Sequence, residues 1–304
     1  MRKESFDPGL STQFSGELRR AINPDGTFNV HRKGTRLRDE NLYLQMIDTT
    51  WPRFFLVVTI VFLAVNVAFA WLYLAIGIGQ LQGTESEMTA FVNAFFFSVH
   101  TLTTVGYGNV FPRGPSANAV AALEAATGLM VFAVMTGLLY GRFSRPSARI
   151  LFSNNALIAP YQDGHSLQFR ITNARSNTLM NLEARVLLMT VTNHDGRLKR
   201  DFVDLELERR KVYFLPLTWT IVHPIDTTSP LSGKTAEDLA QMSAEFLILL
   251  QAFDDSFSQV VHSIYSYRHT EIVWGAKFEP AFSVDPQGDL VLDLDRVNEL
   301  KMLS

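Results

Sequence analysis

Two long runs almost without charge constrain this chain more than any other feature. Phe54 to Ile78 is 25 residues without a charged side chain, and Ala117 to Gly141 is 25 residues with Glu124 as its one charge. At 1.5 Å per residue such a helix is about 37 Å long, enough to cross a bilayer. We predict a multi-pass cell-membrane protein with an outer helix over 53–78 and an inner helix over 116–141.

The flanking residues indicate the orientation. Trp51 and Pro52 mark the start of the first helix, and Arg53 lies at the same end. Three arginines, Arg142, Arg145 and Arg149, follow the second helix. Positive charge gathers on the cytoplasmic side of membrane proteins, so both termini are expected in the cytoplasm, at the inner or plasma membrane.

A third apolar segment, Thr89 to His100, lies between these runs and is too short to span. We predict a re-entrant pore helix over 90–102. The next residues, Thr101 to Val110, contain two glycines. Irregular backbone at membrane depth is tolerated where it is buried or lines a water-filled path, which favours a pore.

The sequence TVGYG at 104–108 is the segment that points to a chemistry. Backbone carbonyls can replace the water around a potassium ion when they point inward along an extended chain. Glycine permits the positive φ angles that this needs, and a Cβ there is expected to clash. One chain offers too few oxygens, so we predict a homotetramer. The predicted filter is Thr104, Val105, Gly106, Tyr107 and Gly108, with K⁺ bound at the first four.

The rest of the chain has a different sequence pattern. From 150 to 304, short strand-like runs alternate with turn signals such as Asp163-Gly164 and Asp195-Gly196, which favours an all-β domain. Residues 39–50 are expected to form an interfacial slide helix or a plain cap on the first span. Residues 1–38 form a polar N-terminal segment, 51–141 the transmembrane pore domain, and 142–149 a linker.

Composition and motifs exclude several classes of function. There is no cysteine, hence no disulfide or thiolate metal site, and the net charge of −3 argues against a nucleic-acid binder. No phosphate-binding loop, metalloprotease or hydrolase motif is present, so we predict no enzyme and no cofactor besides K⁺ as the transported ion. The sequence has no arginine-repeat helix of the kind that forms a voltage sensor.

Together these motifs resemble the potassium-channel family, and specifically the prokaryotic inward-rectifier (KirBac-type) channels. The resemblance rests on TVGYG, Trp51-Pro52, Arg142-Phe143-Ser144-Arg145-Pro146 and several stretches of the later half. Those stretches are Trp219, His223-Pro224-Ile225-Asp226, Ser229-Pro230-Leu231, Glu245-Phe246 and Glu271-Ile272-Val273-Trp274-Gly275. The resemblance implies a tetrameric α-helical membrane pore, with two transmembrane helices and a re-entrant pore helix, joined to an all-β immunoglobulin-like cytoplasmic sandwich.

The inner helix carries candidate cavity and gate residues. Phe132, Thr136 and Tyr140 recur every four residues, and the resemblance places them on the cavity face. Four Tyr140 side chains could form a hydrophobic constriction, although Tyr140 at a lipid interface is an alternative. Gly128 and Gly137 are candidates for hinges or for helix packing. Phe132 replaces the acidic residue of many inward rectifiers, which puts strong rectification in doubt.

Charged groups near the membrane suggest modulation. We expect His100 and Glu124 to interact and protonation of His100 to tune the filter, with a packing role for His100 as the alternative. Arg142, Arg145 and Arg149 are expected to contact anionic membrane lipids, or to act as topology signals alone. Residues 150–304 carry 14 basic and 20 acidic side chains, a balance of −6 that would concentrate cations or serve solubility.

Two rival functions stay open. The chain could be a membrane-anchored β-sandwich binding or sensor module, which would leave the re-entrant TVGYG unexplained. It could also be a weakly selective cation channel.

Overall fold

The computed structural model describes residues 9–10, 13–14, 20–31, 33–34, 41–84, 89–144, 149–194 and 197–303. The chain divides into two compact units, which we describe separately. The helical unit is Lys33–Arg145, and the β unit combines Met1–Arg32 with Pro146–Ser304. Arg145, Pro146, residues 39 and 40, and the Asp195-Gly196 turn, all named above, lie outside the described residues.

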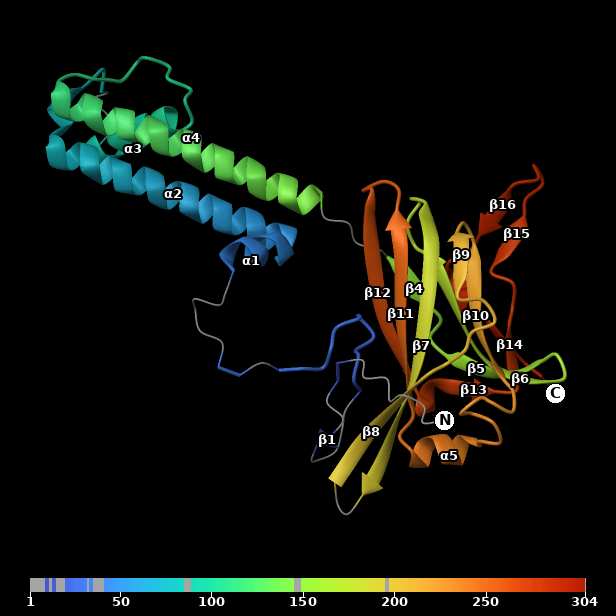
Figure 1. The fold of residues 1–304 in the computed structure, drawn as a ribbon. Coiled ribbons are helices and arrows are strands. Elements are labelled where there is room, and N and C mark those ends of the chain that lie inside the picture. Colours follow the sequence, from blue (N-terminus) through green and yellow to red (C-terminus); the bar gives the residue numbers. More distant parts are fainter. Residues whose placement is uncertain are drawn as a thin grey trace. The chain divides into compact units, whose positions relative to one another are not determined.

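The helical unit contains two long apolar helices and two short ones (Figure 1). They are α1 (Leu42–Asp48), α2 (Trp51–Ile76), α3 (Ala90–Leu102) and α4 (Pro115–Phe143), with a 3₁₀ turn at Ile78–Gln80. Strands β2 (Leu81–Gln82) and β3 (Phe111–Pro112) pair antiparallel. Both α2 and α4 are long and apolar enough to cross a membrane.

The helix bounds follow local chemistry. Helix α2 begins at Trp51, before the expected 53, because Pro52 fits the first turn of a helix, where its missing N–H costs nothing. It ends at Ile76 because Gly77 takes a φ of 102°. Helix α4 continues to Phe143, two residues beyond the expected end.

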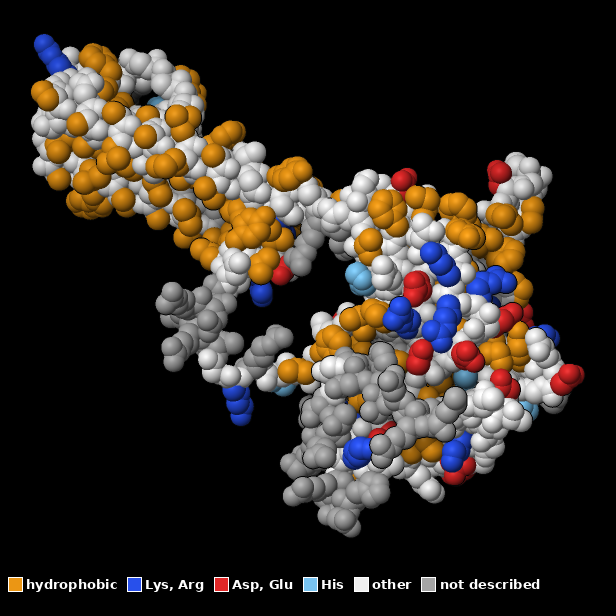
Figure 2. Space-filling model, viewed as in Figure 1, with side chains coloured by type: hydrophobic (Ala, Val, Ile, Leu, Met, Phe, Trp, Pro, Cys, Tyr) orange, Lys and Arg blue, Asp and Glu red, His pale blue; other side chains and the backbone are white. Residues whose placement is uncertain are grey.

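On the face shown in Figure 2, hydrophobic side chains dominate the helical unit, whereas charged side chains of both signs are scattered among hydrophobic ones over the described part of the β unit. On α2, large side chains point outward, including Phe55, Leu56 and Trp71, exposed by 54%, 59% and 61% in the single chain. Such a surface suits lipid contact rather than water. Inside the unit, Phe69, Tyr73 and Phe97 join α2 to α3 in a small core.

The β unit is built on two sheets. The first has the order β1-β8-β7-β11-β12, with β9 paired to β7, and the second has the order β10-β6-β5-β13, with β4 paired to β6. The first sheet comprises β1 (Gln13–Phe14), β7 (Leu179–His194), β8 (Arg197–Asp204), β9 (Lys211–Phe214), β11 (Glu245–Asp254) and β12 (Gln259–Arg268). The second comprises β4 (Ile150–Phe152), β5 (Ala156–Tyr161), β6 (Gly164–Asn173), β10 (Thr218–Ile225) and β13 (Ile272–Trp274).

The two sheets enclose one hydrophobic core and so form a sandwich. Phe169 and Ile221 from the second sheet belong to the same buried cluster as Phe246 and Ile248 from the first. Smaller elements complete the unit: α5 (Ala236–Gln241), 3₁₀ turns at His269–Glu271 and Asp295–Asn298, and the strand pairs β14 (Ala276–Phe278) with β17 (Leu300–Met302) and β15 (Phe282–Val284) with β16 (Leu290–Leu292).

Two segments rich in strand-favouring residues are each divided in the structure. The run Val212 to Val222 is split between β9 and β10, and the run Glu271 to Phe278 is interrupted at Gly275, whose φ is 66°. The residue types favour strand throughout, but the intervening backbone turns between pairing partners.

The N-terminal residues pack on the β unit instead of standing apart. The backbone N–H of Ala21 donates to the buried carboxylate of Glu245 at 3.1 and 3.0 Å. Ile22 joins a cluster with Met189 and Leu247 on the sheet that contains β7 and β11. This contact places part of the expected 1–38 segment within the β unit.

Candidate functional site

The candidate site begins at the C-terminal end of α3. The Thr89 side chain caps the start of this helix by accepting from Val92 N–H at 3.3 Å. At the other end, the carbonyl oxygen of His100 accepts from Val105 N–H at 2.9 Å and from Gly106 N–H at 3.3 Å. The amides of the TVGYG segment are thus tied back to the helix that precedes it.

The backbone of this segment alternates between residues with positive φ and residues without it. Thr104, Gly106 and Gly108 have φ values of 58°, 55° and 80°, whereas Val105 and Tyr107 do not have positive φ. In an extended chain successive carbonyls point to opposite sides. Alternation in the sign of φ turns them toward the same side. Positive φ is costly for threonine but ordinary for glycine. A Cβ built on Gly106 or Gly108 meets no atom within 4 Å in the single chain. The expected clash is therefore absent within one subunit, and the conformation alone requires glycine.

Side chains of the segment contact α3 in part. The Tyr107 ring meets the His100 ring edge-on, with centroids 4.9 Å apart, yet Tyr107 is 74% exposed in the single chain. Val105 is also exposed, by 51%. Phe97 of α3 packs on Tyr73 of α2 instead, with ring centroids 5.0 Å apart.

A close backbone contact supports the far side of the segment. A Cβ on Gly83 would lie 1.8 Å from the carbonyl oxygen of Asn109, the residue after Gly108. The β2–β3 pair lies beside this contact. Gln80 adds to it, since its carbonyl accepts from Arg113 N–H at 2.7 Å. The segment that follows α2 thus holds the chain that leaves the TVGYG segment.

Glu124 is buried in a polar cluster that joins three helices. Tyr73 of α2 donates to one carboxylate oxygen at 2.7 Å, and Ser98 of α3 contacts the other. Ser98 also contacts Asn66 Oδ1 at 3.0 Å. The expected contact between Glu124 and His100 is not formed within the described chain. The two side chains have different partners, and tuning by His100 stays a prediction.

The two candidate hinge glycines differ in their surroundings. A Cβ on Gly128 would lie 2.1 Å from the carbonyl oxygen of Leu102 in α3. A Cβ on Gly137 would meet nothing within 4 Å. In this structure Gly128 is thus a packing glycine, while Gly137 is unconstrained by its own subunit.

The candidate cavity residues share an unpartnered face of α4. Phe132 and Tyr140 are each 73% exposed in the single chain, and Thr136 is exposed as well. The Thr136 hydroxyl donates to the Phe132 carbonyl at 2.9 Å. Glu124 and Gly128, earlier on the same helix, are buried within the subunit. The face with Phe132, Thr136 and Tyr140 is therefore free to meet other copies of the chain.

Arg142 is engaged by the protein itself. Its guanidinium donates to the carbonyls of Met46, Ile47 and Thr49 at the end of α1, at 2.5, 3.0 and 2.7 Å. The guanidinium carbon also lies 4.4 Å from the centre of the Trp51 ring. These carbonyls end a helix and lack helical partners, so a cation suits them. Arg149, by contrast, is exposed.

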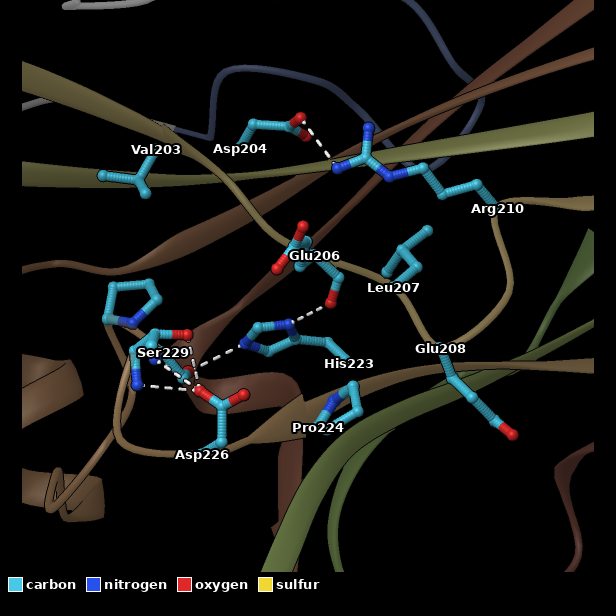
Figure 3. A pocket seen from close by; sticks show the side chains of 12 residues that line it. Val203, Asp204, Glu206, Leu207, Glu208, Arg210, His223, Pro224, Asp226 and Ser229 are labelled. Atoms are coloured by element: carbon cyan, nitrogen blue, oxygen red, sulfur yellow. Dashed lines mark hydrogen bonds and ion pairs between the residues drawn. The ribbon is translucent and has the colours of Figure 1, made fainter. Parts of the chain in front are cut away.

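A pocket of about 670 Å³ lies in the β unit, around His223 (Figure 3). His223 Nδ1 lies 2.5 Å from the carbonyl oxygen of Glu206, and Nε2 lies 2.8 Å from Ser229 Oγ. Because a carbonyl can only accept, Nδ1 carries the hydrogen and Ser229 donates to Nε2. Burial lowers the pKa of His223, which favours this neutral form.

Sequence reasoning missed several of these residues. Asn66 and Ser98 are polar positions within apolar helices, a signal that could have located the Glu124 cluster. Glu245 entered only through the family resemblance, and its contact with Ala21 joins residues too far apart for any local pattern. No cluster of three or more histidine, cysteine, aspartate or glutamate side chains that could hold a metal ion is found among the described residues.

Comparison with known proteins agrees with this geometry. Residues 150–303 match the family described as the inward rectifier potassium channel C-terminal domain, and residues 55–145 match the ion channel family. The chain is 36% identical over 284 residues to the inward rectifier potassium channel Kirbac3.1 of Paramagnetospirillum magnetotacticum, covering 92% of this chain and 95% of that protein.

More distant relatives agree as well. ATP-sensitive inward rectifier potassium channel 12 of Bos taurus is 28% identical over 272 residues, covering 83% of this chain and 64% of its own length. Among solved structures, Bacillus subtilis Spo0M aligns with a TM-score of 0.24 at 10% identity, over 45% of this chain and 59% of its own, which carries no argument about the fold.

The family models together span the helical unit and the β unit, and the likeness to the magnetotactic relative covers nearly the whole of both chains. The two apolar helices and the β-sandwich fit the family's fold, and its members are ion channels rather than enzymes. This membrane protein belongs to the inward rectifier potassium channel family, among its prokaryotic, KirBac-type members.

Proposed function

We propose that four copies of the chain surround one axis and conduct K⁺ through the carbonyl oxygens of Thr104, Val105, Gly106 and Tyr107. The observation that carries this proposal is the alternation in the sign of φ at 104–108. With the amides of Val105 and Gly106 bonded to His100, the segment's carbonyls are left for an ion. Four such chains supply enough oxygens to replace its water.

The direction of α3 supports the same proposal. Its last carbonyls, at the C-terminal end, carry the negative part of the helix dipole, which favours a cation nearby. The TVGYG segment starts at this end. An ion held there gains electrostatic stabilisation before it enters the carbonyl path.

The gate of the proposed channel is the exposed face of α4. Four copies of Phe132 and Tyr140 would narrow the path to an apolar constriction, which blocks ions by excluding water. Because position 132 is occupied by phenylalanine and not by an acidic residue, we expect weak block by internal magnesium or polyamines. Gly137, which has no close neighbour in its own subunit, is the proposed bending point.

The β unit and both termini are proposed to lie in the cytoplasm. Arg53 and Arg142 flank the two helices at this end, in line with the excess of positive charge that cytoplasmic sides carry. We assign contact with anionic lipids to Arg145 and the exposed Arg149, since the Arg142 guanidinium already binds carbonyls of α1. Helix α1 is proposed to lie at the membrane surface.

Ion flux into liposomes tests the proposal. Purified protein in vesicles should take up radioactive rubidium, barium should block the uptake, and an excess of sodium should compete weakly. Comparable sodium and potassium flux would favour a weakly selective cation channel. No flux in any lipid, with or without anionic headgroups, would favour a membrane-anchored binding module.

The variant Gly106→Ala tests the role of the filter. An alanine at a φ of 55° costs about 1–2 kcal/mol per subunit, so the carbonyls should turn and potassium selectivity should be lost. A tetramer of this variant that still prefers potassium to sodium as the parent does would contradict the proposal.

A further inference from the structure

Glu124 is enclosed completely by its own subunit. Its exposure is 0% in the single chain, so neither lipid nor a second copy can reach it without moving a helix. Its polar neighbours are Tyr73, which donates to Oε2 at 2.7 Å, and Ser98, which contacts Oε1. In the described part of the chain, no lysine, arginine or histidine forms an ion pair with it.

If Glu124 is ionised, too few hydrogens are available for the two contacts of the Ser98 hydroxyl. The Ser98 hydroxyl has one hydrogen and lies beside two acceptors, Asn66 Oδ1 at 3.0 Å and Oε1 of Glu124. One hydrogen makes one of these bonds well. The other bond needs a hydrogen from Asn66 or from Glu124.

Asn66 cannot supply it. Its Nδ2 donates to the carbonyl oxygen of Phe62 at 2.7 Å. Turning the amide around would bring Oδ1 to that distance from another acceptor, with no hydrogen between them. The amide orientation is therefore set by Phe62, and Asn66 presents its oxygen to Ser98.

We propose that Glu124 is a neutral carboxylic acid that donates the missing hydrogen to Ser98 and so acts as a positioning residue for α3. The hydrogen bonds then run in one direction, from Tyr73 to Glu124, to Ser98, to Asn66 and to Phe62. Every polar hydrogen that faces the cluster has one acceptor. The chain passes from α2 to α4, to α3 and back to α2, and it clamps the pore helix between the two spans.

The charge of the site supports the neutral form. A buried carboxylate without a cation is among the most costly groups in a protein interior, and more so at membrane depth. A carboxylic acid with both oxygens hydrogen-bonded avoids that cost. In this proposal Glu124 has a structural role as an uncharged group.

The clamp bears on conduction through a short path. Ser98 lies two residues before His100, whose carbonyl holds the amides of Val105 and Gly106. A shift of α3 would move these amides and turn the carbonyls that we propose as ion ligands. This step rests on the proposed function, whereas the protonation of Glu124 does not.

Infrared spectroscopy of the full-length tetramer tests the protonation directly. At neutral pH the parent should have a carboxylic acid carbonyl band that is lost in Glu124→Gln, and Ser98→Ala should shift that band by removing the acceptor of its hydrogen. If no acid band is lost on Glu124→Gln, Glu124 is ionised and the proposal fails. This readout needs no ion flux, so it stands apart from a failure of the proposed function.

Flux tests the positioning role. Glutamine can donate an N–H to Ser98 and accept from Tyr73, so Glu124→Gln should keep rubidium uptake and selectivity within about twofold. Glu124→Ala leaves the Tyr73 hydroxyl without its acceptor and Ser98 without the hydrogen that it accepts, and uptake should fall about tenfold or more. Leu123→Ala, at the adjacent and exposed position, should match the parent. Equal damage from Glu124→Gln and Glu124→Ala would overturn the role.

Discussion

Gly128 of α4 lies against the carbonyl oxygen of Leu102, the last residue of α3. A Cβ at Gly128 would be 2.1 Å from this oxygen and 3.0 Å from the carbonyl carbon. The contact is between backbones, so neither partner can rotate away. It fixes how closely the inner helix approaches the end of the pore helix, two residues before the TVGYG segment.

Gly128→Ala should therefore displace α3 and disturb the proposed filter at 104–108. Overpacking of this kind costs about 1–3 kcal/mol, more than the roughly 1 kcal/mol by which alanine favours a helix over glycine. We expect a lower thermal stability of the protein and a reduced potassium-to-sodium flux ratio, measured in liposomes.

Gly137→Ala is the matched control, since a Cβ there meets nothing within 4 Å in its subunit. Its stability should be equal to or above that of the parent. A change in open probability without a loss of stability would support bending at Gly137. Unchanged behaviour of Gly128→Ala would contradict the packing role.

The spans, the re-entrant helix and the all-β half could all be predicted because each depends on local composition. Uncharged length predicts α2 and α4, and a short apolar run before two glycines predicts α3. The Glu124 cluster could not be predicted in the same way, because it depends on which residues of α2, α3 and α4 face one another. Helical periodicity places Tyr73 and Ser98 on helix faces, but not against Glu124.

The same reason explains the role of Arg142. Its position after an apolar helix is typical both of a topology signal and of a lipid-binding residue. Its observed partners are carbonyls of Met46, Ile47 and Thr49, nearly a hundred positions earlier in the chain. Sequence gives no hint of them, since a backbone carbonyl carries no residue identity.

Arg142→Lys should release the end of α1 from α4. Lysine keeps the charge but lacks the planar fork that reaches several carbonyls at once. The loss of charged hydrogen bonds should lower stability by about 2–3 kcal/mol, seen as faster hydrogen exchange over residues 42–49. Arg149→Lys, at an exposed position, should leave that exchange unchanged. If Arg142→Lys and Arg149→Lys show the same hydrogen exchange over residues 42–49, the carbonyl contacts of Arg142 do not hold α1.

Gly83→Ala should disturb the proposed filter at the end that leads to Asn109. Gly83 has a φ of 85°, and a Cβ would lie 1.8 Å from the carbonyl oxygen of Asn109. The chain around Asn109 must move, so potassium selectivity should fall while the β unit keeps its stability. Gly79→Ala is the control, because a Cβ at Gly79 meets nothing within 4 Å. Equal flux ratios for the two variants would show that Asn109 needs no such support.

The His223 pocket should make the β unit sensitive to acid. Burial lowers the pKa of His223 in the folded protein, so the unfolded chain binds a proton more readily as the pH falls below about 6.5. The stabilisation is complete above that pH and is lost as the pH falls toward the folded-state pKa. Protonation would also place a hydrogen on Nε2, where Ser229 now donates.

Hydrogen exchange over residues 206–231 of the full channel, corrected for the intrinsic effect of pH, measures this loss. Protection should fall between pH 7.5 and 5.5 in the parent, by at most about tenfold, and less in His223→Gln. His269→Gln is the control, because burial and the neighbouring Arg268 lower the pKa of His269 as well. Hydrogen bonds from Thr228 lower the pKa of Asp226, so this carboxyl group titrates below the pH range of the experiment. A pH dependence that survives in His223→Gln but disappears in His269→Gln would assign the sensitivity to His269 instead.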